Sequence, residues 1–166
     1  MAAPRVQRGL LHPLAKPAVF VLSLAPFAAL LHGAVTNTLG ANPAEALIRG
    51  TGEWTLRFLC LVLAVTPLRQ AFALPALARL RRMLGLFAFF YACLHVACYA
   101  WLDMGLDLAL ILPDIAKRNF ILVGTAALLL MLPLAATSFN RAIRALGPAR
   151  WQTLHRAVYA LSLIHI

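Results

Sequence analysis

Acidic residues are scarce in this chain. It has 5 Asp and Glu against 15 Lys and Arg, which gives a formal net charge of +10. Charged residues make up only 12% of its 166 residues, about half of the ~25% found in an average soluble domain. The long apolar runs contain no acid at all. Catalysis by a pair of carboxylates inside those runs is therefore excluded.

Cysteine motifs are also missing. Cys60, Cys93 and Cys98 all fall within apolar runs, and they form neither a C-x-x-C pair nor a C-x-x-C-H motif. Such cysteines are typical of small apolar filling residues. The basic residues separate the apolar runs and form no continuous stripe, so we expect no nucleic-acid partner.

The chain is instead rich in long apolar segments. It is 63% hydrophobic, with a mean hydropathy of +0.84. We predict an all-α, polytopic transmembrane helix bundle that forms a single domain over residues 1–166. Four complete spans are expected at 17–35, 54–72, 83–102 and 119–139, with part of a fifth from 151 to 166. The Gly-, Asn-, Pro- and Thr-rich stretch 36–53 is expected to be a loop, and Pro26 is expected to kink the first span.

The basic residues predict the orientation of the bundle. An N-terminus in the cytoplasm places ten of them beside the cytoplasmic ends of the spans: Arg5, Arg8, Lys16, Arg69, Arg79, Arg81, Arg82, Arg141, Arg144 and Arg150. Only Arg49, Lys117 and Arg118 then lie outside. Because the loops are short, the positive-inside rule predicts a cytoplasmic N-terminus. The third and fifth spans then run in the same direction.

His95 is an ionisable residue in the middle of the third span, and such a residue indicates a functional site. It lies about 18 Å from the start of that span, and His165 lies about 21 Å along the fifth. His155 is only about 6 Å along the fifth span. The depths predict that His95 and His165 face each other in the outer half, with His155 in a separate inner site.

Aromatic residues flank two of these histidines at a spacing of four. Tyr91 and Tyr99 flank His95, while Trp151 and Tyr159 flank His155. Residues four apart share a helix face, so each imidazole is expected to project from an aromatic ridge beside a flat ligand such as haem. Two alternatives stay open. The aromatic rings belong to the interfacial aromatic belt, or a Tyr–His hydrogen bond satisfies a buried imidazole that has only a structural role.

The chain resembles the MsrQ (YedZ) family of haem-binding membrane subunits, within the ferric-reductase-like transmembrane group. The resemblance covers most of residues 39–159. It rests on LGANPAEALIRGTGEWTLRFL (39–59), VTPLR (65–69), RRMLGL (81–86), LHVACYA (94–100) and LGPARWQTLHRAVY (146–159). The family's third histidine would fall at position 168 and a sixth span would follow. The resemblance therefore implies a C-terminally shortened chain, with LSLIHI unlike the family's continuation.

The resemblance implies a b-type haem protein of the bacterial inner membrane, with flavin mononucleotide (FMN) also associated with the family. It would take electrons from quinone or a cytoplasmic flavin reductase. It would pass them to a periplasmic, molybdopterin-containing methionine sulfoxide reductase (MsrP-like). The family's haem ligands correspond to His95 and His155, whereas His165 is a candidate from depth alone.

We expect no catalytic residues in such a subunit, because iron held by imidazoles exchanges electrons without a general acid, base or nucleophile. Arg82 and Arg156 are candidates to pair with haem propionates near the cytoplasmic face, and Arg57 is a further one near the other end. Two other classes remain open: a transporter that uses the histidines as a proton relay, and a membrane scaffold in which they only pack.

Overall fold

Every regular element in the part of the chain that the structure describes is helical. The structure is a computed structural model that describes residues 3–156. Its elements are α1 (Ala3–Leu11), α2 (Ala15–Val35), α3 (Pro43–Ala71), η1 (Pro75–Leu77), α4 (Ala78–Cys98), η2 (Tyr99–Asp103), α5 (Leu108–Lys117), α6 (Asn119–Ala136), α7 (Asn140–Leu146) and α8 (Pro148–His155). The predicted all-helical class is confirmed.

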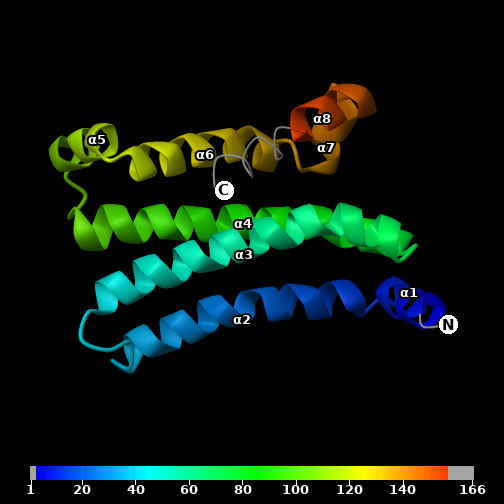
Figure 1. The fold of residues 1–166 in the computed structure, drawn as a ribbon, viewed down its shortest axis with the longest axis horizontal. Helices are drawn as coiled ribbons and strands as arrows, with labels where there is room; N and C mark the ends of the chain where they lie inside the picture. Colours follow the sequence, from blue (N-terminus) through cyan, green and yellow to red (C-terminus); the bar gives the residue numbers. More distant parts are fainter. Residues whose placement is uncertain (1–2, 157–166) are drawn as a thin grey trace.

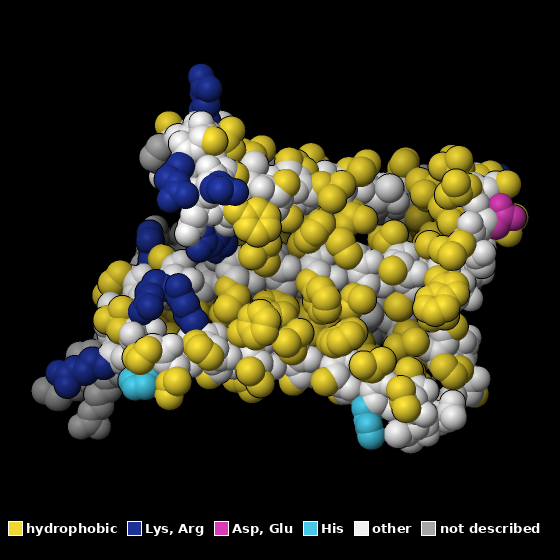
Figure 2. Space-filling model, turned by 180° about the vertical axis from the view of Figure 1, so that it is seen from behind, with side chains coloured by type: hydrophobic (Ala, Val, Ile, Leu, Met, Phe, Trp, Pro, Cys, Tyr) yellow, Lys and Arg dark blue, Asp and Glu magenta, His cyan; other side chains and the backbone are white. Residues whose placement is uncertain are grey.

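The long helices α2, α3, α4 and α6 run alongside one another, and the short ones lie at the two ends (Figure 1). We call the end with α1, α7 and α8 the basic end, since arginines of these helices and of the start of α4 gather there (Figure 2). We call the other end, with η2, α5 and the start of α3, the acidic end, since Glu45, Asp103, Asp107 and Asp114 lie in or beside these elements.

Within residues 3–156, three helical segments are long and apolar enough to cross a membrane, namely Ala15–Val35, Pro75–Asp103 and Asn119–Ala136. They agree with the first, third and fourth predicted spans, so this is a multi-pass membrane protein. The α3 helix has 29 residues, about 43 Å, but it is not among these three segments. It also carries charged residues. Two of those charges pair with each other, because Arg57 Nη2 lies 2.9 Å from Glu53 Oε2. Most of the predicted fifth span lies outside the described residues.

The prediction of a loop over 36–53 was wrong for its second half. The α3 helix begins at Pro43, where the Asn42 side chain accepts a hydrogen bond from the Glu45 amide at 3.2 Å. Asparagine at the N-cap, proline at the first position and an acid in the first turn together start a helix. Glu45 and Glu53 are consequently helical, and not in or beside loops. Gly50, Thr51 and Gly52 do not break the helix, and the Thr51 hydroxyl donates back to the Leu47 carbonyl.

The core lies where α3 packs against α4. Its buried members are Phe58, Val62 and Val65 from α3 and Leu80, Leu84, Phe87, Ala88 and Tyr91 from α4. Tyr91 stacks on Phe58 with ring centroids 5.3 Å apart and planes 12° apart, and Phe58 stacks on Phe87 at 5.7 Å. Two helices that are consecutive in sequence thus form the centre of the bundle. Of α6, only Ala127 is buried.

Tyr91 also holds α2 against this pair. Its side chain is fully buried, its hydroxyl donates to the Ser23 carbonyl at 2.8 Å, and it accepts from the Phe27 amide at 3.0 Å. In an uninterrupted helix the Phe27 amide would bond to the Ser23 carbonyl directly. The hydroxyl is therefore inserted into this step of the α2 ladder, next to Pro26, which has no amide proton to donate.

Replacing Tyr91 by Phe should destabilise the bundle by about 1–3 kcal/mol, the usual cost of leaving a buried donor and acceptor without a partner. Thermal unfolding in detergent micelles measures the loss. Tyr99→Phe is the control: it removes one hydrogen bond, to Asp114 at the acidic end, and should cost less. Equal stability of Tyr91→Phe and the unaltered chain would show that the inserted hydroxyl contributes nothing.

Candidate functional site

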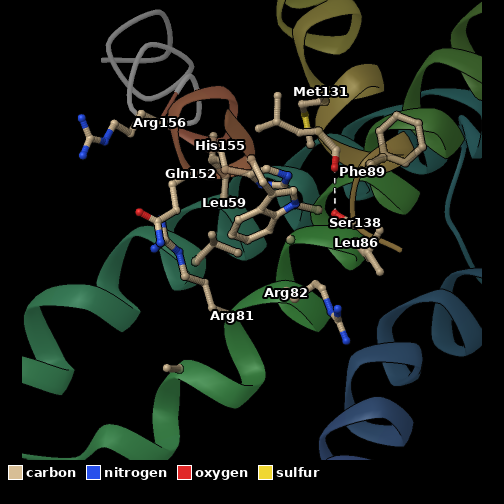
Figure 3. Close-up of a pocket in the computed structure, with 17 residues that line it drawn as sticks. Leu59, Arg81, Arg82, Leu86, Phe89, Met131, Ser138, Gln152, His155 and Arg156 are labelled. Carbon is tan, nitrogen blue, oxygen red and sulfur yellow. Dashed lines mark hydrogen bonds between the residues drawn. The ribbon is translucent and has the colours of Figure 1, made fainter. Parts of the chain in front are cut away.

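A cavity of about 470 Å³ opens between α3, α4, α6 and α8 at the basic end (Figure 3). This volume lies within the range of small-molecule sites, about 300–1,000 Å³. Its walls are mostly apolar, and its polar side chains are few. The lining residues that matter for its chemistry are Arg81, Arg82, Trp151, Gln152, His155 and Arg156, with Gly85 and Ala88 on the wall formed by α4.

His155 reaches this cavity because the chain reverses direction at Gly147. That residue ends α7 and precedes α8 with φ of 75°, a left-handed conformation that glycine adopts without steric cost. Pro148 follows at the first position of α8, where its missing amide proton costs nothing. The L-G-P sequence thus turns α8 so that its imidazole lines the space between α4 and α6.

Two contacts fix the His155 ring. Trp151 lies one turn earlier and stacks on it, with centroids 4.1 Å apart and planes 28° apart. The Thr137 hydroxyl lies 3.2 Å from Nε2, and Trp151 Nε1 donates to the Thr137 carbonyl at 2.9 Å. The predicted aromatic neighbour of His155 is confirmed for Trp151, whereas Tyr159 lies outside the described residues.

The arginines of the cavity differ in their roles. Arg82 donates to the Asn140 side chain at 2.7 Å, which joins α4 to α7, and in Figure 3 it points away from His155. Arg156 extends outward at the rim in the same view. The positive charge of Arg81 acts electrostatically on His155. Arg57 of α3 does not line the cavity. It pairs with Glu53, and its guanidinium carbon lies 4.7 Å from the centre of the Trp54 ring.

His95 does not line the cavity. Its position on α4 is nevertheless related to it, because Arg81, Ala88 and His95 are spaced by seven residues and share one face of the helix. His95 lies about 10 Å beyond Ala88 towards the acidic end. The structure thus places His95 and His155 at different levels of the bundle, and the separate inner site at His155 stays a prediction. His165 lies outside the described residues.

The surroundings of His95 differ from the predicted aromatic ridge. Its Nδ1 lies 2.8 Å from the Ile48 carbonyl oxygen of α3. Tyr91 is engaged with α2, and Tyr99 donates to Asp114 at 2.7 Å. The imidazole is thus tied to a backbone carbonyl and not to a tyrosine. Among residues 3–156 there is no group of three or more His, Cys, Asp or Glu that could hold a metal ion.

Sequence reasoning missed Thr137, Ile48 and Arg81. Thr137 and Ile48 act through one hydroxyl and one carbonyl, and nothing in their identity distinguishes them from other residues of a membrane helix. Arg81 could have been found, because its spacing of seven and fourteen residues from Ala88 and His95 places it on their face. An imidazole in an apolar cavity with arginines nearby suits a flat apolar ligand that contains a metal and has acidic groups on one edge.

Comparison with known proteins agrees with this chemistry. Residues 51–166 match the family described as ferric reductase like transmembrane component. The protein-methionine-sulfoxide reductase heme-binding subunit MsrQ of Polaromonas naphthalenivorans is 62% identical over 162 residues, which cover 96% of this chain and 74% of that protein. The proteins of the same name from Azospira oryzae and Bordetella pertussis are 56% and 54% identical. Each match covers 91% of this chain, and 65% and 73% of those proteins, respectively.

No solved structure is significantly similar to the chain. The family match covers more than half of the sequence, and the Polaromonas protein is similar over nearly all of it. The chain therefore belongs to the MsrQ family of membrane subunits, within the ferric reductase-like transmembrane group.

Proposed function

We propose that this protein is a b-type haem subunit that relays electrons across the bacterial inner membrane to a methionine sulfoxide reductase. The observation that carries the proposal is His155 in an apolar cavity near arginines. His95 lies on the face of α4 that lines this cavity, about 10 Å beyond Ala88. The relatives' name, heme-binding subunit, supports the cofactor. The 62% identity to the Polaromonas subunit over 96% of the chain supports the role.

The residues present fit a haem. His155 would offer an imidazole nitrogen to the iron, Trp151 supports the imidazole by stacking, and apolar side chains of α3, α4 and α6 line the remaining walls. Ligation through Nε2 requires the Thr137 hydroxyl to turn away, because that hydroxyl now occupies the nitrogen at 3.2 Å. Arg81 and Arg156 supply positive charge for propionates, whereas Arg82 is held by Asn140.

A bound haem supplies a centre that gains and loses one electron at a time. The work of the protein is to hold the ligand rings in place, exclude water and set the surrounding charge. His95 and His155 serve as ligands at two levels of the bundle, and His165 is the further candidate opposite His95. Among residues 3–156, the acids lie towards the opposite end from the cavity.

The orientation follows from the charges. The basic end faces the cytoplasm, together with the N-terminus, and the acidic end faces the periplasm. In this proposed topology, α3 is the second of four complete membrane spans, although it contains ion pairs. The partial fifth span begins with α8. Electrons enter from quinone or a cytoplasmic flavin reductase, with FMN as a further cofactor. They leave to a periplasmic molybdopterin-containing subunit, which reduces the sulfoxide.

An absorption spectrum of the purified chain tests the cofactor. A Soret band with sharp α and β bands after reduction is expected. A featureless visible spectrum after expression with sufficient haem would reject the proposal, and would leave a proton-relay transporter or a scaffold.

Single histidine variants test the ligands. His95→Ala and His155→Ala should each lower the haem bound per protein by about half or more, since an axial ligand is lost. Haem content by the pyridine haemochrome assay, with membrane insertion checked separately, provides the measurement. His32→Ala, at the exposed end of α2, is the matched control and should retain its haem. Full haem content in either ligand variant would remove that residue from the site.

Filling the cavity tests whether it holds the haem, and it leaves both candidate histidine ligands unchanged. A side-chain carbon added to Gly85 would meet only Val62, at 4.0 Å, so Gly85→Phe should project into open space and exclude a flat ligand. We expect lower haem content and an unchanged amount of protein in the membrane. Gly124→Phe on α6 has nothing within 4 Å and serves as the control. Equal haem in the two variants would place the cofactor elsewhere.

A further inference from the structure

We propose that Gly52 is a positioning residue for His95: its missing side chain lets the imidazole lie against α3 and donate from Nδ1 to the Ile48 carbonyl, which leaves Nε2 as the iron-binding atom. This inference rests on the proposed function, because it concerns the ligand role of His95. It names a residue of α3 that contacts no cofactor and acts only through the histidine ring.

The hydrogen bond determines which nitrogen carries the proton. His95 Nδ1 and the Ile48 carbonyl oxygen are 2.8 Å apart. A carbonyl oxygen only accepts, so the proton must reside on Nδ1 and the lone pair of the neutral ring must reside on Nε2. Histidines that bind metals almost always donate their other N–H to a carbonyl, carboxylate or water in this way, which fixes the ring and raises the basicity of the ligand.

The carbonyl is reachable only because residue 52 has no side chain. Ile48 is four residues before Gly52 in α3, so its carbonyl points along the helix towards the Gly52 amide. The ring of His95 must lie over Gly52 to reach it. A carbon added to Gly52 would lie 3.1 Å from both Cε1 and Nδ1 of His95, closer than the ~3.5–4.0 Å at which carbon atoms normally pack.

One other group competes for the same carbonyl. The Thr51 hydroxyl lies 3.0 Å from the Ile48 oxygen, but its shorter contact, 2.7 Å, is with the Leu47 carbonyl. The second lone pair of the Ile48 oxygen is therefore available to the imidazole. The α3 helix, which carries no histidine, thus contributes to the site through its backbone.

Gly52→Ala should displace the ring by a few tenths of an ångström and weaken the Nδ1–H bond. The less basic ligand stabilises ferric iron less, so the midpoint potential of the His95-dependent haem should rise. Its low-spin signal in electron paramagnetic resonance should also shift. Gly52→Val should lose that haem altogether. All measurements use the full 166-residue chain in lipid nanodiscs.

Gly50→Ala is the matched control. It lies two residues away in the same helix, and its added carbon would meet Leu30 of α2 at 2.8 Å without touching His95. It should lower the thermal stability and leave the potential and the resonance signal unchanged. Equal potentials and signals for Gly52→Ala and the unaltered chain would overturn the proposal. So would the same shift in Gly50→Ala, since general strain in α3 would then explain it.

A second measurement needs no variant. In the haem-free chain, labelled with ¹⁵N at histidine and held at a pH where the ring is neutral, His95 should show a protonated Nδ1 and an unprotonated Nε2. The opposite tautomer would overturn the inference. These outcomes are distinct from failure of the proposed function, which His95→Ala tests: full haem content in that variant removes the ligand itself, whereas the Gly52 results concern only its orientation.

Discussion

The packing of α3 against α4 is the interaction on which the rest of this structure depends. Stacked rings of Phe58, Phe87 and Tyr91 fill the contact, and the Tyr91 hydroxyl extends it to α2. The same helix pair forms two walls of the cavity and brings the Ile48 carbonyl to His95. Aromatic packing in the middle of the pair therefore sets the distance between the helices for both histidine levels.

Much of the fold could be predicted from the sequence, because a membrane span is specified by its length and hydropathy. The apolar runs at 17–35, 83–102 and 119–139 correspond to α2, α4 with η2, and α6. The start of α3 was misjudged, because its glycines and threonines suggested a loop, although N-P-x-E at 42–45 encodes a helix start. The orientation predicted from the basic residues stays a prediction.

The candidate site was predictable only in part. His95 and His155 were identified because ionisable residues in apolar runs are costly, and their different depths followed from the helical rise. Their surroundings could not be predicted, since they depend on groups that every residue possesses or that many share: the carbonyl of Ile48, the hydroxyl of Thr137, the absent side chain of Gly52. Such contacts follow from the approach of neighbouring helices, which hydropathy does not specify.

The π-helical turn η2 directly follows the histidine-bearing part of α4 and is the first element of the acidic end after it. It begins at Tyr99, after α4 has ended at Cys98, and its hydrogen bonds span five residues where those of an α-helix span four. Loss of a residue there would turn the following backbone by about 100° and leave His95 in place. Changes of register or length beyond the turn in which Tyr99 meets Asp114 would therefore leave the His95 imidazole, one helical turn earlier, undisturbed.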